Sequence, residues 1–138
     1  MTHRFHERIR RIVAGFDWSR FATILDVGGG QGRVLAAILD AHPRMHGHLV
    51  DLEPTATEAR RTFSAQDLTE RTQVTAGSFF DPLPVGADAY VLFDILHNWD
   101  DEHAYRILGR CVAPAGRILV IEGVGDCGPA VRATCACS

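Results

Sequence analysis

The chain has 138 residues, of which 46% are hydrophobic and 22% charged, and its formal net charge is −3. This length allows one domain with a buried core, and the composition is typical of a soluble globular protein. The negative charge argues against binding to nucleic acid, and no apolar run reaches the ~20 residues that span a bilayer. Because the polar N-terminus also lacks the apolar stretch of a signal peptide, we expect a cytoplasmic protein.

An N-terminal amphipathic helix is the first predicted element, within residues 1–20. Apolar residues recur at helical spacing from Phe5 to Phe16, with arginines between them. The arginines fit the solvated face of this helix better than an arm for nucleic acid; they are Arg4, Arg8, Arg10 and Arg11.

Strands and helices alternate over residues 21–124, the predicted core domain. Apolar runs predict five strands, at Phe21–Val27, His46–Leu52, Thr72–Ala76, Ala87–Ile95 and Arg117–Glu122. Helical periodicity and capping residues predict helices at Gln31–Ala41, Pro54–Ala65 and Asp100–Val112. The alternation indicates an α/β fold with a Rossmann-like, doubly wound and mainly parallel sheet. Residues 125–138 show neither periodicity, and we expect them to form an irregular tail.

A glycine-rich turn, Asp26-Val-Gly-Gly-Gly-Gln-Gly32, separates the first strand from the following helix. Glycines let the backbone pass close to a ligand, and the start of the helix offers free N–H groups to an anionic group. Asp51 ends the second strand, where a carboxylate can accept hydrogen bonds from both hydroxyls of a ribose. Together these features predict that the chain binds a nucleoside-containing cofactor.

Ligands of open α/β sheets bind outside the carboxyl ends of the strands. Among the residues expected there, His97 is a candidate general base because an imidazole titrates near neutral pH. Glu122, at the end of the fifth strand, can orient and polarise that imidazole. Position alone equally allows a histidine that only hydrogen-bonds at a helix entrance and a glutamate at a solvated strand end. No metal is predicted, because the cysteines form no Cys-x-x-Cys pair and the histidines give no ligand set.

Four segments resemble the S-adenosylmethionine-dependent O-methyltransferases of the caffeic-acid and bacterial polyketide type, which have the class I methyltransferase fold. They are the glycine-rich turn, Gly77–Pro84, Ile95–His103 and Arg117–Glu122. The resemblance covers roughly residues 5–124, and its specific part is the run Leu-His-Asn-Trp-Asp-Asp-Glu that begins at Leu96.

The resemblance implies transfer of a methyl group from S-adenosylmethionine to a hydroxyl of a small phenolic or polyketide-like molecule, without a metal. It implies that His97 deprotonates the acceptor hydroxyl with help from Glu122. The loop glycines are expected beside the methionine part of the cofactor, and Asp51 on its ribose. The residues expected to bind the cofactor, from these motifs and from the strand ends, are Gly28, Gly29, Gly30, Asp51, Leu52, Ser78 and Phe79.

The chain departs from the family pattern in three ways. Ser78 stands where an aspartate usually contacts the adenine amine, and Phe93 stands where a lysine is common. Nothing matches the N-terminal domain through which full-length relatives dimerise, so we expect a monomer or weak association. The C-terminal antiparallel hairpin is also expected to be missing, which leaves five strands.

Two alternative functions therefore stay open. The first is a non-catalytic, cofactor-binding remnant of such an enzyme, which the missing segments favour. The second is a nicotinamide-dependent dehydrogenase. Three consecutive glycines in place of the spaced fingerprint, and the lack of a Tyr-x-x-x-Lys set, argue against this second alternative.

Overall fold

The computed structural model describes residues 3–78, 83–84, 86–93, 102–103, 106–107, 117–123 and 129–135. Its α-helices are α1 (His3–Ala14), α2 (Arg33–Ala41) and α3 (Thr55–Ala65), and two short 3-10 helices are η1 (Trp18–Arg20) and η2 (Thr69–Arg71). Its strands are β1 (Thr23–Val27), β2 (His46–Asp51), β3 (Thr72–Ala76), β4 (Ala89–Phe93), β5 (Arg117–Gly123) and β6 (Pro129–Cys135). The helix predicted at Asp100–Val112 lies largely outside the described residues.

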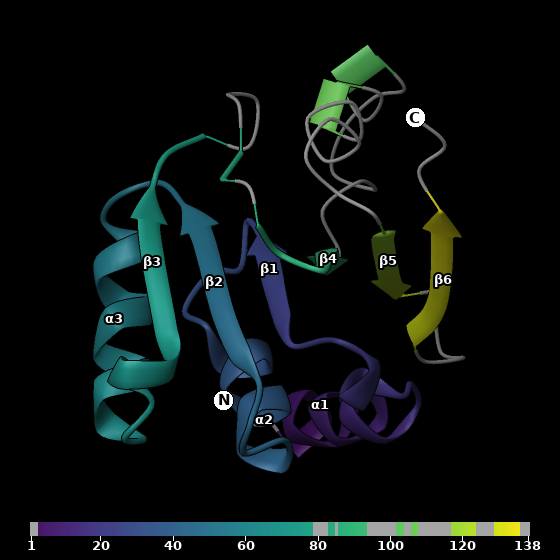
Figure 1. Cartoon of the computed structure of the whole chain (residues 1–138), viewed down its shortest axis with the longest axis horizontal. Coiled ribbons are helices and arrows are strands. Elements are labelled where there is room, and N and C mark those ends of the chain that lie inside the picture. The colour runs from purple at the N-terminus through teal and green to yellow at the C-terminus, as the bar shows by residue number, and fades with distance from the viewer. Residues whose placement is uncertain are drawn as a thin grey trace.

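The strands form one sheet in the order β3-β2-β1-β4-β5-β6 (Figure 1). The pairs β1–β2, β2–β3, β1–β4 and β4–β5 are parallel, which confirms the predicted doubly wound, mainly parallel sheet. The chain works outward from β1 to β3 and then returns to the other side of β1 with β4. This reversal makes the carboxyl ends of β1 and β4 the topological switch point, where open α/β sheets bind their ligands.

The expectation of an irregular tail is wrong for residues 129–135, which form β6. This strand pairs antiparallel with β5, from Pro129 opposite Gly123 to Cys135 opposite Arg117. The part of the chain that the structure describes therefore contributes six strands to the sheet, where five were expected. The sequence signal is weak because only small residues alternate with polar ones there. The strand forms because the edge of β5 offers backbone groups that need hydrogen-bond partners.

A continuous apolar core lies between the sheet and helices α1, α2 and α3, which pack in a row with α2 in contact with both α1 and α3 (Figure 1). β1 contributes Ile24 and Leu25, which are almost fully buried, as expected for a strand covered on both faces. Trp18 is fully buried, and its indole N–H donates a hydrogen bond to the carbonyl oxygen of Ile12 (3.1 Å). This bond fixes the end of α1 to the segment that leads into β1.

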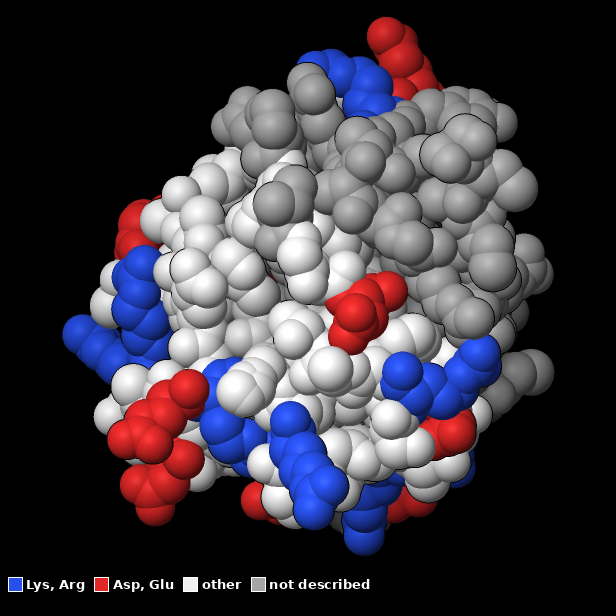
Figure 2. Space-filling model, in the orientation of Figure 1, with Lys and Arg blue, Asp and Glu red and all other residues white. Residues whose placement is uncertain are grey.

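The described surface carries both signs of charge. On the face shown in Figure 2, basic and acidic side chains intermingle over the described residues. Within the described ranges no helix has the length and apolar character to cross a membrane. The same residues contain no group of three or more His, Cys, Asp or Glu side chains placed to hold a metal ion.

Candidate functional site

The loop between β1 and α2 carries three glycines with left-handed backbone conformations. The φ angles of Gly28, Gly30 and Gly32 are 68°, 63° and 78°, a region that residues with a Cβ rarely adopt. Gln31 and Gly32 belong to this loop, so α2 begins two residues later than predicted. A methyl group on Gly29 would lie 2.6 Å from Asp26 Oδ2, whereas one on Gly30 would meet no atom within 4 Å. The loop is thus tightly packed on its inner side and open at Gly30.

Asp51 joins the glycine loop to the end of β2. Its Oδ2 accepts a hydrogen bond from the Gly30 N–H (2.9 Å) and its Oδ1 one from the Leu52 N–H (2.7 Å). The carbonyl oxygen of Asp51 accepts a third bond from the N–H of Gly77, just after β3 (2.9 Å). A carboxylate has about four acceptor positions, so two remain for neighbouring hydroxyl groups. The carboxylate is therefore held in place with free capacity where the ends of β1, β2 and β3 meet.

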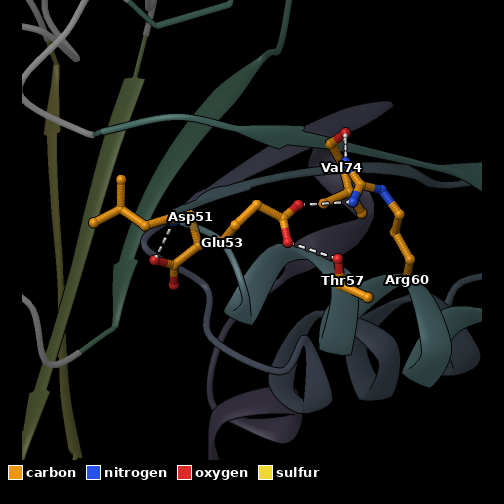
Figure 3. Close-up of polar contacts among 6 residues, drawn as sticks. Asp51, Glu53, Thr57, Arg60 and Val74 are labelled. Atoms are coloured by element: carbon orange, nitrogen blue, oxygen red, sulfur yellow. Dashed lines mark hydrogen bonds and ion pairs between the residues drawn. The ribbon is translucent and has the colours of Figure 1, made fainter.

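Hydrogen bonds from α3 hold the loop that follows β2 (Figure 3). Glu53 accepts hydrogen bonds from the Thr57 hydroxyl (2.6 Å) and from Arg60 Nη1 (3.0 Å), and these bonds lower the pKa of the exposed Glu53 carboxyl. Leu52 lies between Asp51 and this anchor with 56% of its surface exposed. An exposed leucine beside the Asp51 carboxylate offers an apolar surface suited to a flat aromatic group.

A cavity of about 370 Å³ lies between α1 and the glycine loop. Its lining includes Arg8 and Ile12 of α1, Asp26 of β1, the loop glycines and Phe93 at the end of β4. Asp26 is 1% exposed, and within the described part of the chain neither of its carboxylate oxygens has a hydrogen-bond partner. Burial, and secondarily the nearby charge of Asp51, raise the pKa of Asp26 to about 8. The cavity therefore contains a carboxyl group that is mostly neutral below about pH 8.

The structure brings most of the predicted cofactor residues together at the carboxyl ends of β1, β2 and β3. Gly28–Gly30, Asp51 and Leu52 form the contiguous site described above. Ser78 is half-buried and follows Gly77, whose N–H bonds to the Asp51 carbonyl. The backbone of Glu122 lies in β5, one residue before its end, and pairs with Ala130 of β6.

Two of the predicted site residues, His97 and Phe79, lie outside the described residues. The position of the candidate general base relative to the glycine loop therefore stays a prediction.

Of the charged residues that line the cavity, which are Arg8, Asp26 and Arg33, the sequence analysis named none as a site residue. Asp26 is an ionisable residue within an otherwise apolar strand, and this position could have identified it as a buried carboxyl group that needs a partner. Arg8 was assigned with its neighbours to a solvated face, but it is half-buried and lines the cavity. Its spacing of four residues from Ile12 places it on the apolar side of α1, and this was the available signal.

The strand order, the glycine loop and Asp51 define a Rossmann-like cofactor-binding domain of the class I methyltransferase type. Comparison with known proteins agrees with this assignment. The chain belongs to the O-methyltransferase domain family, whose family model matches residues 1–137.

Curated and solved relatives come from bacterial biosynthetic systems. The chain is 46% identical over 130 residues to 2,7-dihydroxy-5-methyl-1-naphthoate 7-O-methyltransferase of Streptomyces carzinostaticus, covering 91% of this chain and 39% of that protein. It is 47% identical over 110 residues to aclacinomycin 10-hydroxylase RdmB of Streptomyces purpurascens, covering 78% of this chain and 29% of that protein. The chain thus spans well under half the length of these relatives.

A solved structure shows the same architecture. The O-methyltransferase NcsB1 from neocarzinostatin biosynthesis, in complex with S-adenosylmethionine and 2-hydroxy-5-methyl naphthoic acid, superimposes with a TM-score of 0.85 at 45% identity. The match covers 91% of this chain and 40% of that one.

Proposed function

We propose that this chain binds S-adenosylmethionine and belongs to an enzyme that methylates a hydroxyl of a small phenolic or polyketide-like molecule. The observation that carries the proposal is the Asp51 carboxylate at the carboxyl end of β2, which is fixed by the N–H groups of Leu52 and of Gly30 in the neighbouring glycine loop. Membership of the O-methyltransferase family and the solved complex of NcsB1 with S-adenosylmethionine support it.

The residues of the site fit the parts of this cofactor. The two remaining acceptor positions of Asp51 suit the two ribose hydroxyls, and the exposed Leu52 suits the adenine ring. Ser78 offers a hydroxyl near the same end of β3, in place of the usual aspartate. The loop from Gly28 to Gly30 leaves open space for the methionine part. S-adenosylmethionine, when bound, supplies an electrophilic methyl group on a sulfonium centre.

We assign the removal of the proton from the acceptor hydroxyl to His97. A neutral imidazole takes this proton at physiological pH, which makes the acceptor oxygen nucleophilic. Glu122 stabilises the resulting imidazolium as its carboxylate partner. General base catalysis of this kind contributes roughly 10²–10⁴-fold to the rate, and positioning of the acceptor contributes the rest.

Isothermal titration tests which cofactor the chain binds. We expect the chain to bind S-adenosylhomocysteine more tightly than NAD. Asp51→Asn is expected to weaken binding of S-adenosylhomocysteine at least tenfold, because it replaces a carboxylate oxygen that accepts a hydrogen bond from a ribose hydroxyl with an amide NH₂ group, which can only donate. Asp40→Asn, at an exposed position of α2, is the matched control and should leave the affinity unchanged. Tighter binding of NAD would favour the dehydrogenase alternative and overturn the proposal.

Transfer of a labelled methyl group to a panel of phenols tests whether His97 is the general base. His97→Ala is expected to lower transfer by roughly 10²–10⁴-fold while S-adenosylhomocysteine binding stays unchanged. His46→Ala serves as the control because His46 is exposed at the start of β2, at the other end of that strand from Asp51. Full activity of His97→Ala would remove this residue from the role. A chain that binds the cofactor without transferring methyl groups would support the remnant alternative. The assay is needed because a relative at 47% identity is named a hydroxylase.

A further inference from the structure

One arginine of α3 links the loop that follows β2 to strand β3 (Figure 3). Arg60 Nη1 donates a hydrogen bond to Glu53 Oε1 (3.0 Å), and its Nη2 donates one to the carbonyl oxygen of Val74 (3.4 Å). The Thr57 hydroxyl, earlier in α3, donates to the other carboxylate oxygen of Glu53 (2.6 Å). We call these contacts of Glu53, Thr57, Arg60 and the Val74 carbonyl the α3 bracket. The planar guanidinium presents its donors in a fixed fork, so it holds its two partners at a defined distance from each other.

The α3 bracket adjoins the carboxyl ends of β2 and β3, where the proposed function places the nucleoside of the cofactor. Glu53 follows Asp51 by two residues, and the exposed Leu52 lies between them. On β3, Gly77 follows Val74 by three residues and donates its N–H to the carbonyl oxygen of Asp51 (2.9 Å). One guanidinium therefore connects the two segments that meet at Asp51.

The contribution of the α3 bracket to overall stability is small. The side chains of Arg60 and Glu53 are 48% and 46% exposed, and ion pairs this accessible to water add little to the free energy of folding. Helix α3 packs on β2 and β3 through its buried residues, which are Ala56, Ala59 and Phe63. By contrast, Leu52, Glu53 and Pro54 are all exposed, so the loop has little buried surface of its own to hold it. The bracket therefore restricts the loop more than it stabilises the fold.

We propose that Arg60 is a positioning residue for the nucleoside half of the cofactor, acting through Glu53 and the Val74 carbonyl. It holds the loop so that Asp51 and Leu52 keep the arrangement that the ribose and the base require. This inference rests on the proposed function, which assigns those two residues to the nucleoside. Loss of the α3 bracket lets the loop take further arrangements, and the apparent affinity then falls in proportion to the fraction of molecules that stay competent to bind.

Two ligands that share the nucleoside test this role. S-adenosylhomocysteine and 5′-methylthioadenosine carry the same adenosine and differ in the amino-acid part. By isothermal titration, we expect Arg60→Met to weaken binding of both by the same factor, roughly three- to tenfold, because it removes the fork and keeps an apolar stem. Arg61→Met is the matched control, since Arg61 is the next residue of α3, is exposed and takes no part in the α3 bracket. The midpoint of thermal unfolding should shift by no more than a few degrees for either variant.

A double-mutant cycle identifies the partner through which Arg60 acts. Glu53→Gln alone should weaken binding of both ligands, because a neutral amide bonds the guanidinium less strongly than a carboxylate does. Added to Arg60→Met, it should cause little further loss. Arg60→Lys should recover part of the affinity, since its ammonium can pair with Glu53 but lacks the fork that also reaches Val74. Fully additive losses, or a lysine variant that binds no better than the methionine variant, would contradict a role through Glu53.

A measurement on the ligand-free protein separates this inference from the proposed function. The Leu52 N–H bonds to Asp51 Oδ1 (2.7 Å), and its hydrogen exchange should be several-fold faster in Arg60→Met, while that of the buried Leu49 in β2 stays unchanged.

The outcomes that would overturn the positioning role differ from those that defeat the proposed function. If the wild-type chain binds both ligands, then unchanged Leu52 exchange or unchanged affinity in Arg60→Met overturns the role and leaves the proposed function intact. A loss confined to S-adenosylhomocysteine, or an equal loss in Arg61→Met, has the same meaning. A wild-type chain that binds neither ligand would defeat the proposed function and this inference with it.

Discussion

At pH 8 and above, Asp26→Asn is expected to raise the free energy of unfolding of the ligand-free protein by a few kcal/mol. The pKa of Asp26 is about 8 in the folded protein and about 3.9 in an unfolded chain. The folded state therefore binds this proton more tightly than the unfolded state does. The resulting contribution to stability is fully present below about pH 4 and is lost as the pH rises to about 8, by up to about 1.4 kcal/mol per pH unit.

Asparagine cannot ionise, so the variant should lack this pH dependence. Denaturant unfolding of both proteins between pH 4 and pH 9 measures the effect, and the two curves should converge at low pH and diverge as the pH rises. Asp40→Asn, at an exposed site, should follow the unsubstituted protein throughout. Parallel curves for Asp26→Asn and the unsubstituted protein would mean that Asp26 ionises normally in the folded state.

Alanine at two neighbouring positions of the glycine loop is expected to destabilise the fold for two different reasons. Gly29→Ala places a methyl group 2.6 Å from both Asp26 Oδ2 and Leu49 Cδ1. Both groups are buried, so the loop and the core must shift, and we expect a loss of roughly 2–4 kcal/mol in the free energy of unfolding. Gly30→Ala meets no atom within 4 Å and strains only a φ of 63°, which costs about 1–2 kcal/mol.

The two variants should separate stability from binding. The methyl group of Gly30→Ala enters the open space assigned to the cofactor, so we expect S-adenosylhomocysteine to bind at least tenfold more weakly to a protein that is still folded. Gly86→Ala is the matched control, because Gly86 also has a positive φ (103°) with open space around it but precedes β4 at the opposite end of the sheet. Thermal unfolding and isothermal titration of the three variants test these outcomes. Unchanged binding by Gly30→Ala would place the cofactor elsewhere.

Local patterns were sufficient to predict much of the fold and part of the site. Strand β3 was predicted with its observed bounds, and β1, β2, β4 and β5 were recognised as apolar runs. The glycine loop and Asp51 were identified because turn glycines and a polar residue at a strand end are properties of a few neighbouring residues. The parallel order followed from the alternation of strands and helices, since crossover connections allow few topologies.

Long-range packing decided the rest. The segment 129–135 has only a weak alternation of its own, and it is a strand because the edge of β5 pairs with it. Arg8 and Asp26 are distant in the chain, and only the packing of α1 beside the glycine loop brings them to one cavity. Sequence by itself determined most of the elements up to β5 and the position of the glycine loop, because propensity and turn chemistry act over a few residues. The burial of Asp26, its raised pKa and the direction of Arg8 depend on which groups pack around them, and only the tertiary structure decided these.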